Sequence, residues 1–353
     1  RPRSFSLVAA LALGVGLFGA AGPATAEPGA ATLLTSADDV QRVYGADRVG
    51  TAIAASTTFS GQGAGAVVLT RSDTFADALA GAPLASDKGG PLLMTSRTEL
   101  LPSVAAALKD SLKAGGTVYM LGDTNALSAG VEQQIRALGF AVQRVAGPDR
   151  FATAVEIAKL LPAATSVALV TGWNYPDGLA AGALMGVLDE GTQHSIGVVL
   201  LSDGANIGAT TLNYLNARQF ATKAAIGGVA ATAAAAAGSG WGQLRGNDRY
   251  ETAAVVAQAF TSTGFFKDST TVIGVATGEN WPDALAGSGL LAYAGGPMIL
   301  TRPGDLPAAS RNAIVALQAD ARSNSKEIED VLVFGDTNSV SATVFNQVVD
   351  AVK

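Results

Sequence analysis

The sequence has 353 residues, of which 48% are hydrophobic and 15% charged, and its formal net charge is −6. This composition is typical of a globular chain with ample material for a core, and an acidic chain without a Lys/Arg cluster argues against nucleic acid as a partner. The absence of cysteine excludes disulfides and thiolate metal sites.

The first 26 residues have the layout of a secretory signal. Arg1 and Arg3 precede an apolar run over residues 5–21, and Ala24-Thr25-Ala26 provides small residues for cleavage. An uncleaved membrane anchor is the alternative, but the run is short and contains three glycines. We therefore expect an exported chain with a signal peptide at 1–26, an N-terminal extension at 27–39 and no membrane span after cleavage.

A Gly-x-Asp-Arg turn followed by Thr-Ala marks a long internal repeat. Its three arginines, Arg48, Arg150 and Arg249, are separated by 102 and 99 residues. Three copies at one period indicate three structural units. We place them at residues 40–141, 142–240 and 241–353.

Strands alternate with helices inside each unit. Unit one has strand patterns at 66–70, 91–95 and 117–121, and a helix pattern at 104–112; Asp77 precedes a further helix. Unit two has strand patterns at 167–171, 197–201 and 224–226. Unit three has strand patterns at 270–277, 297–301 and 330–334, and helix patterns at 252–260, 284–294, 308–319 and 341–352. This alternation predicts an α/β fold with right-handed crossovers and a mainly parallel sheet.

One strand pattern lies outside the repeat. A strand at 142–145 follows unit one and a weaker one at 241–244 follows unit two, whereas unit three has none after it. A spare strand at 40–44 precedes the first turn instead. We predict that it completes unit three and closes a pseudo-threefold ring, which a large separation between Val43 and the helix ending at Val352 would contradict.

An aspartate follows the first strand of every unit: Asp77, Asp177 and Asp283. A carboxylate there complements a helix N-terminus and can pair with arginine, which favours a structural role. The alternative is ligand contact, because the loops at 71–76, 172–176 and 278–282 lie at the carboxyl ends of parallel strands. Aromatic residues in two of these loops offer stacking surfaces for sugar rings. They are Trp173, Tyr175 and Trp281.

The repeated Asp-Arg pairs also allow two interpretations, ligand contact or a structural role. A guanidinium can bind phosphate or carboxylate groups bidentately. An arginine at a helix start, preceded by an aspartate, is at least as often a local brace, and we favour that role. The pairs are Asp47 with Arg48, Asp149 with Arg150, and Asp248 with Arg249.

Enzyme motifs are scarce. The sole histidine, His194, lies in an insertion at 189–195 that only unit two carries, so a triad has no repeated support. Nucleophile-elbow, Walker and dinucleotide motifs are absent. A two-carboxylate glycosidase stays open, because its acids need no fixed spacing along the chain. We predict no catalytic residues, no metal site and no cofactor.

With these motifs, residues 40–353 resemble the cell wall binding repeat 2 family of exported Gram-positive bacterial proteins. The resemblance rests on the Gly-x-Asp-Arg and Asp-Ala-Leu-Ala phrases, on the strand Pro297-Met298-Ile299-Leu300-Thr301, and on a Gly-Asp turn before a Ser-capped helix. It implies Toprim-like parallel-sheet units and non-covalent attachment to anionic cell-wall polymers, teichoic acids or phosphorylated polysaccharides, with peptidoglycan as a further candidate partner.

The resemblance also suggests where a polymer makes contact. The family's contacts are expected near the second strand of each unit and its following loop, that is at Thr95, Ser96, Arg97, Ser202, Asp203, Thr301 and Arg302. Ser202 departs from the threonine of the other units, so the three sites need not be equal. Two alternatives to a wall-binding function remain: a peptidoglycan hydrolase or its modifier, and an extracellular binder of a small ligand.

Overall fold

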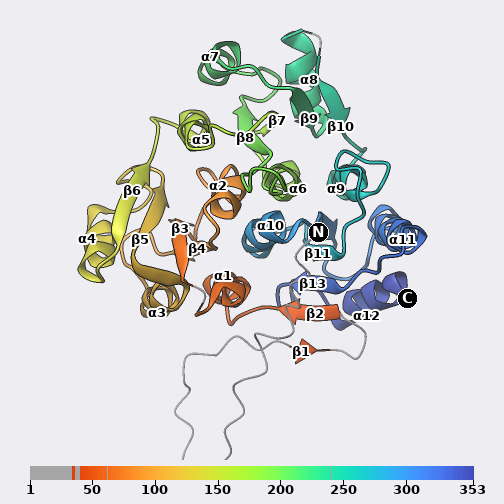
Figure 1. Cartoon of the computed structure of the whole chain (residues 1–353), viewed down its shortest axis with the longest axis horizontal. Coiled ribbons are helices and arrows are strands. Elements are labelled where there is room, and N and C mark those ends of the chain that lie inside the picture. The colour runs from red at the N-terminus through yellow and green to blue at the C-terminus, as the bar shows by residue number, and fades with distance from the viewer. Residues whose placement is uncertain (1–33, 36–39, 62, 239) are drawn as a thin grey trace, which may run out of the picture.

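The computed structural model describes residues 34–35, 40–61, 63–238 and 240–353 (Figure 1). The predicted signal peptide at 1–26 and most of the extension at 27–39 lie outside the described residues. The rest of the chain forms three parallel sheets with helices between them, as the alternating pattern predicts.

Unit one contains a sheet in the order β4-β3-β5-β6, with all neighbours parallel. Its elements are β3 (Ala64–Arg71), α2 (Gly81–Asp87), β4 (Leu92–Thr95), α3 (Pro102–Ser111), β5 (Leu112–Leu121), α4 (Ala129–Ala137) and β6 (Ala141–Val145). The chain leaves β3 to one side for β4 and returns to the other side for β5. Open α/β sheets usually bind ligands at such a reversal of strand order, at the carboxyl ends of the strands.

Unit two repeats this arrangement in the order β8-β7-β9-β10, again all parallel. Its elements are β7 (Ser166–Thr171), α6 (Pro176–Met185), β8 (Gly197–Ser202), α7 (Ala209–Ala217), β9 (Thr222–Ile226), α8 (Gly228–Ala236) and β10 (Gly242–Leu244). The predicted insertion forms a tight turn in which Leu188 bridges Ser195.

Unit three takes its fourth strand from the N-terminal part of the chain, which confirms the predicted closure. Its own elements are β11 (Val272–Thr277), α10 (Pro282–Ala294), β12 (Met298–Thr301), α11 (Ala308–Ser323), β13 (Asp330–Phe334) and α12 (Ala342–Val352). Strand β2 (Val40–Val43) pairs in parallel with β13, and β1 (Leu34–Thr35) adds an antiparallel edge. The Gly335 N–H donates to the Val43 carbonyl at 2.9 Å. The other two sheets repeat this bond at 2.9 Å, between Gly122 and Val145 and between Gly227 and Leu244.

Each unit opens with a helix that packs on its predecessor. These helices are α1 (Arg48–Ser56), α5 (Arg150–Lys159) and α9 (Arg249–Ala257). Helix α1 packs against α10, α5 against α2, and α9 against α6. The contacts therefore run from unit one to two, from two to three, and from three back to one, which is a closed ring.

The centre of the ring consists of α2, α6 and α10, seen end on in Figure 1. Small residues allow these helices to approach closely. A Cβ built on Gly186 would lie 2.5 Å from Ala292, and one on Gly182 would lie 3.1 Å from Ala82. Ser288 Oγ donates to the Leu179 carbonyl at 2.8 Å across the same interface. The glycine and alanine content of these helices is thus a packing requirement.

One predicted helix start is wrong. Asp77 lies in a turn four residues before α2, whereas Asp177 and Asp283 lie in the first turns of α6 and α10. Units two and three have proline at the first helical position, where its fixed φ favours helix initiation, and unit one has Ala76 there.

Candidate functional site

The aspartate of every Gly-x-Asp-Arg turn is a helix N-cap. Asp47 and Asp149 each accept a hydrogen bond at Oδ1 from the backbone N–H three residues further on, both at 2.8 Å. Asp248 Oδ1 accepts bonds from the N–H groups two and three residues on, at 2.9 and 2.8 Å. These carboxylates satisfy otherwise unpaired donors and complement the positive end of the helix.

The neighbouring arginine holds the loop after the first strand of its own unit. Arg48 Nη1 donates to the Ser72 carbonyl at 2.9 Å. Arg150 Nη1 donates to the equivalent carbonyl of unit two at 2.7 Å, and Arg249 Nη1 does so in unit three. Charge-assisted bonds of this kind are stronger than neutral ones, so the arginines fix the position of the loops.

The same arginines also contact an aromatic residue of the preceding unit. Each first-strand loop carries this residue two positions before its aspartate. The distances from guanidinium carbon to ring centroid are 6.0 Å for Arg150 and Phe75, 5.8 Å for Arg249 and Tyr175, and 5.6 Å for Arg48 and Trp281. We call these six residues the axial cluster.

The rings of the axial cluster bring the three loops together. The Phe75 ring centroid lies 5.5 Å from that of Tyr175 and 6.3 Å from that of Trp281, both edge-on. Trp281 is only 8% exposed, whereas Phe75 and Tyr175 are half-buried. Since one ring comes from each unit, the cluster marks one end of the pseudo-threefold axis.

Phe75 was missed by the sequence reasoning. It occupies the position of Tyr175 and Trp281, but its loop lacks the following proline and contains no tryptophan or tyrosine. Superposing the three loops on their repeated aspartates is the signal that identifies it.

The aspartates after the first strands lie at the seams between units. Burial raises the pKa of Asp77 and of Asp283, while a hydrogen bond from a threonine of the next unit, Thr153 or Thr51, opposes the shift. Burial raises the pKa of Asp177 to about 6, opposed only by the Arg249 charge. The arginines act on these carboxylates without a hydrogen-bonded ion pair in the described residues.

The hydroxyl residues predicted near the second strands are fully buried. Thr95 Oγ1 and Thr301 Oγ1 each donate to the carbonyl four residues further on at 3.1 Å, and Ser202 Oγ donates to the carbonyl two residues on at 3.0 Å. They shape the loops that follow. In those loops Arg97 and Asp203 are exposed.

The two remaining predicted residues of these loops, Ser96 and Arg302, are half-buried. Ser96 precedes Arg97, and Arg302 lies 4.9 Å from the Tyr250 ring centroid. Arg302 Nη1 also donates to an Asp305 carboxylate oxygen at 3.0 Å. The guanidinium of Arg302 is therefore positioned by its own unit at the rim of the site.

Trp173 is the most exposed of the predicted aromatic residues, at 58%. Its Nε1 donates to Asp203 Oδ1 at 2.7 Å, and Arg150 lies 4.8 Å from its ring centroid. Trp173 and Asp203 are both predicted site residues, and the structure brings them into contact from separate loops of unit two.

The sole histidine does not form a catalytic triad. His194 Nδ1 lies 3.0 Å from Asp87 Oδ1, and the next residue is Ser195. However, Ser195 is buried and its Oγ donates to the Pro83 carbonyl at 2.7 Å. The serine therefore serves as a link between units two and one and is not activated by the imidazole.

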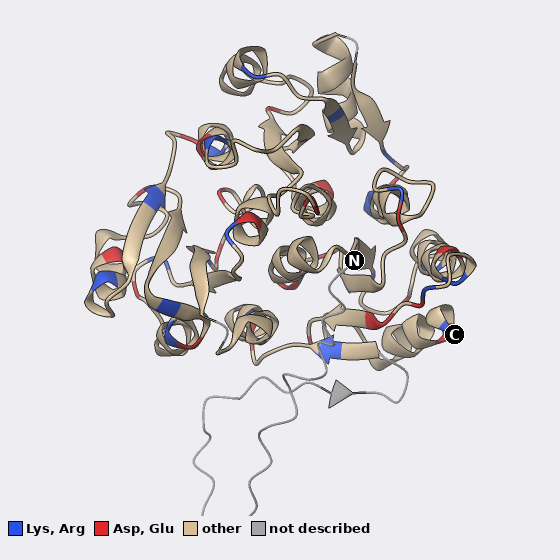
Figure 2. Ribbon diagram, viewed as in Figure 1, with Lys and Arg blue, Asp and Glu red and all other residues tan. Residues whose placement is uncertain are grey.

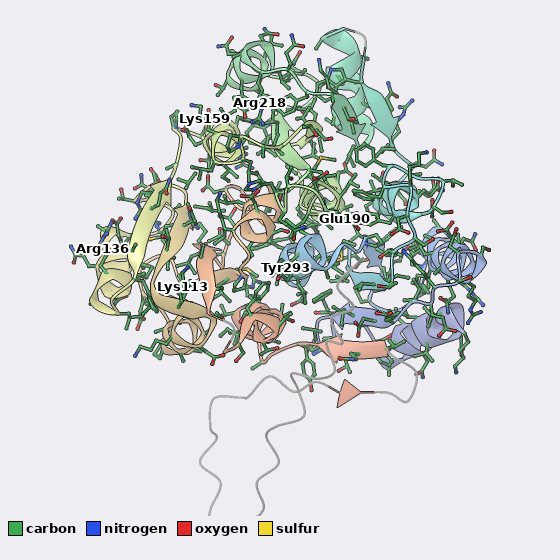
Figure 3. All side chains as sticks on the ribbon, in the orientation of Figure 1. Lys113, Arg136, Lys159, Glu190, Arg218 and Tyr293 are labelled. Carbon is green, nitrogen blue, oxygen red and sulfur yellow. The ribbon has the colours of Figure 1, made fainter. Side chains whose placement is uncertain are left out.

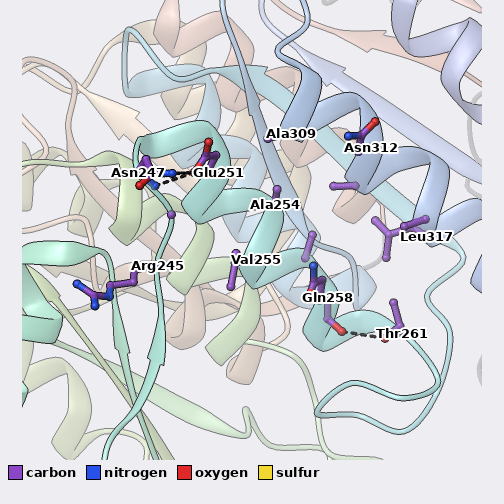
Figure 4. A pocket seen from close by; sticks show the side chains of 14 residues that line it. Arg245, Asn247, Glu251, Ala254, Val255, Gln258, Thr261, Ala309, Asn312 and Leu317 are labelled. Carbon is purple, nitrogen blue, oxygen red and sulfur yellow. Dashed lines mark hydrogen bonds between the residues drawn. The ribbon is translucent and has the colours of Figure 1, made fainter.

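A groove of ≈ 740 Å³ runs between α9 and α11 (Figure 4). Small side chains such as Ala254 and Ala313 line it, and a bond of 2.7 Å between Asn247 and Glu251 spans one rim. None of the residues predicted as sites from the sequence lines this groove.

Charges are interspersed around the ring, and acidic residues appear at the central helices (Figure 2). In the described ranges there is no cluster of three or more His, Cys, Asp and Glu residues suited to a metal ion. Among the helices of the described chain, none combines the length and apolarity that crossing a membrane requires.

Known proteins share this architecture. The chain is 22% identical to Cwp6 from Clostridium difficile, with a TM-score of 0.74 over 90% of this chain and 48% of that one. Cwp8 from the same organism gives 21% identity and a TM-score of 0.73 over 89% and 52%. The α/β fold is thereby confirmed, whereas its Toprim-like character stays a prediction.

A curated relative is N-acetylmuramoyl-L-alanine amidase LytC of Bacillus subtilis (strain 168), 28% identical over 312 residues. This alignment covers 88% of our chain but only 58% of the amidase. The chain thus spans about half to three fifths of the length of these relatives. The profile described as Cell wall binding domain 2 (CWB2) matches residues 42–132, 144–237 and 243–345. The chain therefore belongs to the cell wall binding domain 2 family, with three tandem copies of its repeat.

Proposed function

We propose that this chain is a secreted, non-catalytic wall protein that attaches non-covalently to anionic cell-wall polymers through its three repeats. Its membership of a cell wall binding family supports attachment to the wall. The proposal adds the ligand class, a teichoic acid or phosphorylated polysaccharide, and export by the signal peptide predicted at residues 1–26.

The observation that carries the proposal is the arrangement of Arg48, Arg150 and Arg249 around one end of the axis. In the described residues, only Nη1 of each guanidinium donates a hydrogen bond. The other N–H groups remain able to bind a phosphate or carboxylate oxygen. Three such groups from one rigid ring suit a polymer with repeated anionic groups, because linked weak contacts gain from high effective concentration.

Arg97 and Arg302 extend this basic region to the loops after the second strands, together with Ser96. We assign these three residues ligand contact in the proposal. Thr95, Ser202 and Thr301 contribute by shaping the loops, and the N-cap aspartates by positioning the arginines.

Retention on purified Gram-positive cell walls tests the proposal. The protein should bind intact walls and lose most of its binding to walls stripped of anionic polymers, and the affinity should fall as salt screens the contacts. Equal binding to stripped walls would contradict the ligand class.

Two variants sharpen this test. Arg97→Gln should weaken wall binding without changing the melting temperature, because its side chain is exposed and makes no hydrogen bond in the described residues. Arg136→Gln, on α4 at the periphery (Figure 3), should leave binding unchanged. Equal effects of the two variants would indicate a non-specific charge effect.

A peptidoglycan hydrolase is the second candidate, because one relative is named an amidase. Release of sugars or peptides from peptidoglycan by the purified chain would support the hydrolase and overturn the non-catalytic proposal. An extracellular small-ligand binder is the third candidate, and it predicts saturable binding of a free ligand without retention on walls.

A further inference from the structure

Unit two lacks a turn that closes the carboxyl end of the sheet in the other two units. After β5, Asp123 Oδ1 accepts bonds from the N–H groups two and three residues on, at 2.9 and 3.0 Å. After β13, Asp336 Oδ1 forms the same turn at 3.0 and 2.9 Å. Unit two has Gly227-Gly228-Val229 in this place, and α8 begins immediately at Gly228.

Asp177 lacks the hydrogen bond that this turn provides in unit three. In unit three, Ser339 of the closing turn donates to Asp283 Oδ2 at 3.0 Å. Asp177 accepts no hydrogen bond from any described residue, although its side chain is half-buried and packs against Gly227. The fully buried polar atoms without a partner in the described residues belong to Thr70 and Ser86, so the oxygens of Asp177 face the open space beside them and are free to accept a hydrogen bond from a ligand there.

A cavity of ≈ 490 Å³ lies beside Asp177, and Gly228 and Val229, which stand in the place of the missing turn, line it. It lies where β7 and β9 end, at the point where the strand order of unit two reverses, and its volume is within the usual range of small-molecule sites. Its walls include the indole of Trp173, the amide of Asn174, and the charged groups of Asp177, Asp248 and Arg249.

These groups match the chemistry of a sugar ring. An exposed indole stacks on the apolar face of a pyranose, while carboxylate and amide groups bond its hydroxyls. The charged residues that line the cavity are two carboxylates and Arg249, which it shares with the axial cluster, so the net charge of the lining is negative and suits a neutral ligand inside the cavity better than an anionic one. We propose that this cavity binds one neutral sugar residue, stacked on Trp173 and hydrogen-bonded to Asp177.

The inference goes beyond the proposed function, because it concerns only the seam between units two and three and a neutral ligand. A glycan with anionic groups can engage both features at once, with a sugar in the cavity and its charges at the arginines. The two proposals fail separately, since free monosaccharides report on the cavity and stripped walls report on the anionic contacts.

The test is ligand-observed NMR of the full chain with glucose, N-acetylglucosamine and glucuronic acid as probes. At least one neutral sugar should bind with millimolar affinity and should outcompete glucuronic acid. Trp173→Ala should reduce the affinity about tenfold or more, because it removes the stacking surface. Glu279→Ala, at the same loop position of unit three, should have no effect.

A second variant tests the cavity without altering Trp173 or Asp177, because it fills the cavity with a new side chain. Gly228 lines the cavity, and a Cβ built on it meets no atom within 4 Å, so Gly228→Phe should fill the cavity and abolish sugar binding. Gly304→Phe is the matched control, since Gly304 also has open space around it. Melting temperatures establish that each variant is folded.

Three results would overturn the inference. They are no binding of either neutral sugar up to roughly 50 mM, well above a millimolar dissociation constant, tighter binding of glucuronic acid, or unchanged sugar binding in a folded Gly228→Phe variant.

Discussion

Replacing Asp177 by asparagine should stabilise the protein near neutral pH. The carboxylate is half-buried at the seam between units two and three and lacks a hydrogen-bond partner in the described residues. Asparagine has nearly the same shape and carries no charge. The substitution therefore removes the cost of burying an ion while keeping the packing around Gly227.

The size of the effect follows from the pKa of Asp177, which rises from 3.8 to about 6 on folding. This shift corresponds to about 3 kcal/mol, since one pKa unit equals about 1.4 kcal/mol. The folded state binds the proton more tightly, so the stabilisation by protonation is complete below pH 3.8. It is lost as the pH rises through about 6.

The free energy of unfolding should therefore respond to pH differently in the two proteins. The stability gain of Asp177→Asn should be near zero below pH 4 and should reach up to about 3 kcal/mol at pH 8. Asp283→Asn provides the comparison, because Thr51 and Ser339 donate to that carboxylate. Its replacement should stabilise the fold less, or destabilise it.

Urea denaturation at intervals between pH 4 and 8 measures this difference directly. The reasoning would be refuted by a gain that is independent of pH, or by a loss of stability at pH 8 in Asp177→Asn. Either result would mean that the carboxylate has a stabilising partner within the folded chain.

Two further predictions concern the seams and the ring closure. Gly227→Ala should lower the free energy of unfolding by about 2 kcal/mol or more, because φ of Gly227 is +89° and the new Cβ would lie 1.9 Å from Asp177 Oδ2. The control Gly304→Ala should change the free energy of unfolding by less than about 0.5 kcal/mol in the same denaturation assay. Arg42→Ala should lower the free energy of unfolding by about 2–4 kcal/mol, because the buried Arg42 Nη1 donates to two carbonyls of unit three. Gln243 is the exposed counterpart in unit two, so Gln243→Ala should have little effect on stability. Equal losses of stability in the two variants would argue against closure of the ring by β2.

The repeated units and their closure could be predicted from sequence because both leave local patterns. In the helix-capping phrase Gly-x-Asp-Arg-x-x-Thr-Ala, the glycine N–H donates to the threonine hydroxyl six residues on and the aspartate caps the helix, so both of these contacts are local. The spare strand at 40–44 was identifiable because it stands just before the first Gly-x-Asp-Arg turn, as the strands at 142–145 and 241–244 stand before the second and third. These features required only chain order and the tendency of parallel sheets to extend by one further strand.

The candidate site was harder to predict because its contacts cross between units. Phe75 differs in type from Tyr175 and Trp281, and its role depends on Arg150 of another unit. The cavity beside Asp177 lies where unit two lacks the Gly-Asp-Thr-Asn turn of the other units, and the absence of a turn leaves no motif in the sequence. Such features follow from comparing the three units in space.

The three units share the contacts of the repeated arginines but differ in the turn near the repeated aspartate. Arg48, Arg150 and Arg249 all join a helix start to a loop and to the preceding unit, so loss of one weakens a seam of the whole ring. The closing turn is different, because unit two lacks it, has a cavity beside that place, and still keeps its seams with both neighbouring units. Divergence is therefore tolerated at this position, and a rigid ring of similar units can acquire one distinct ligand site while the others keep their common geometry.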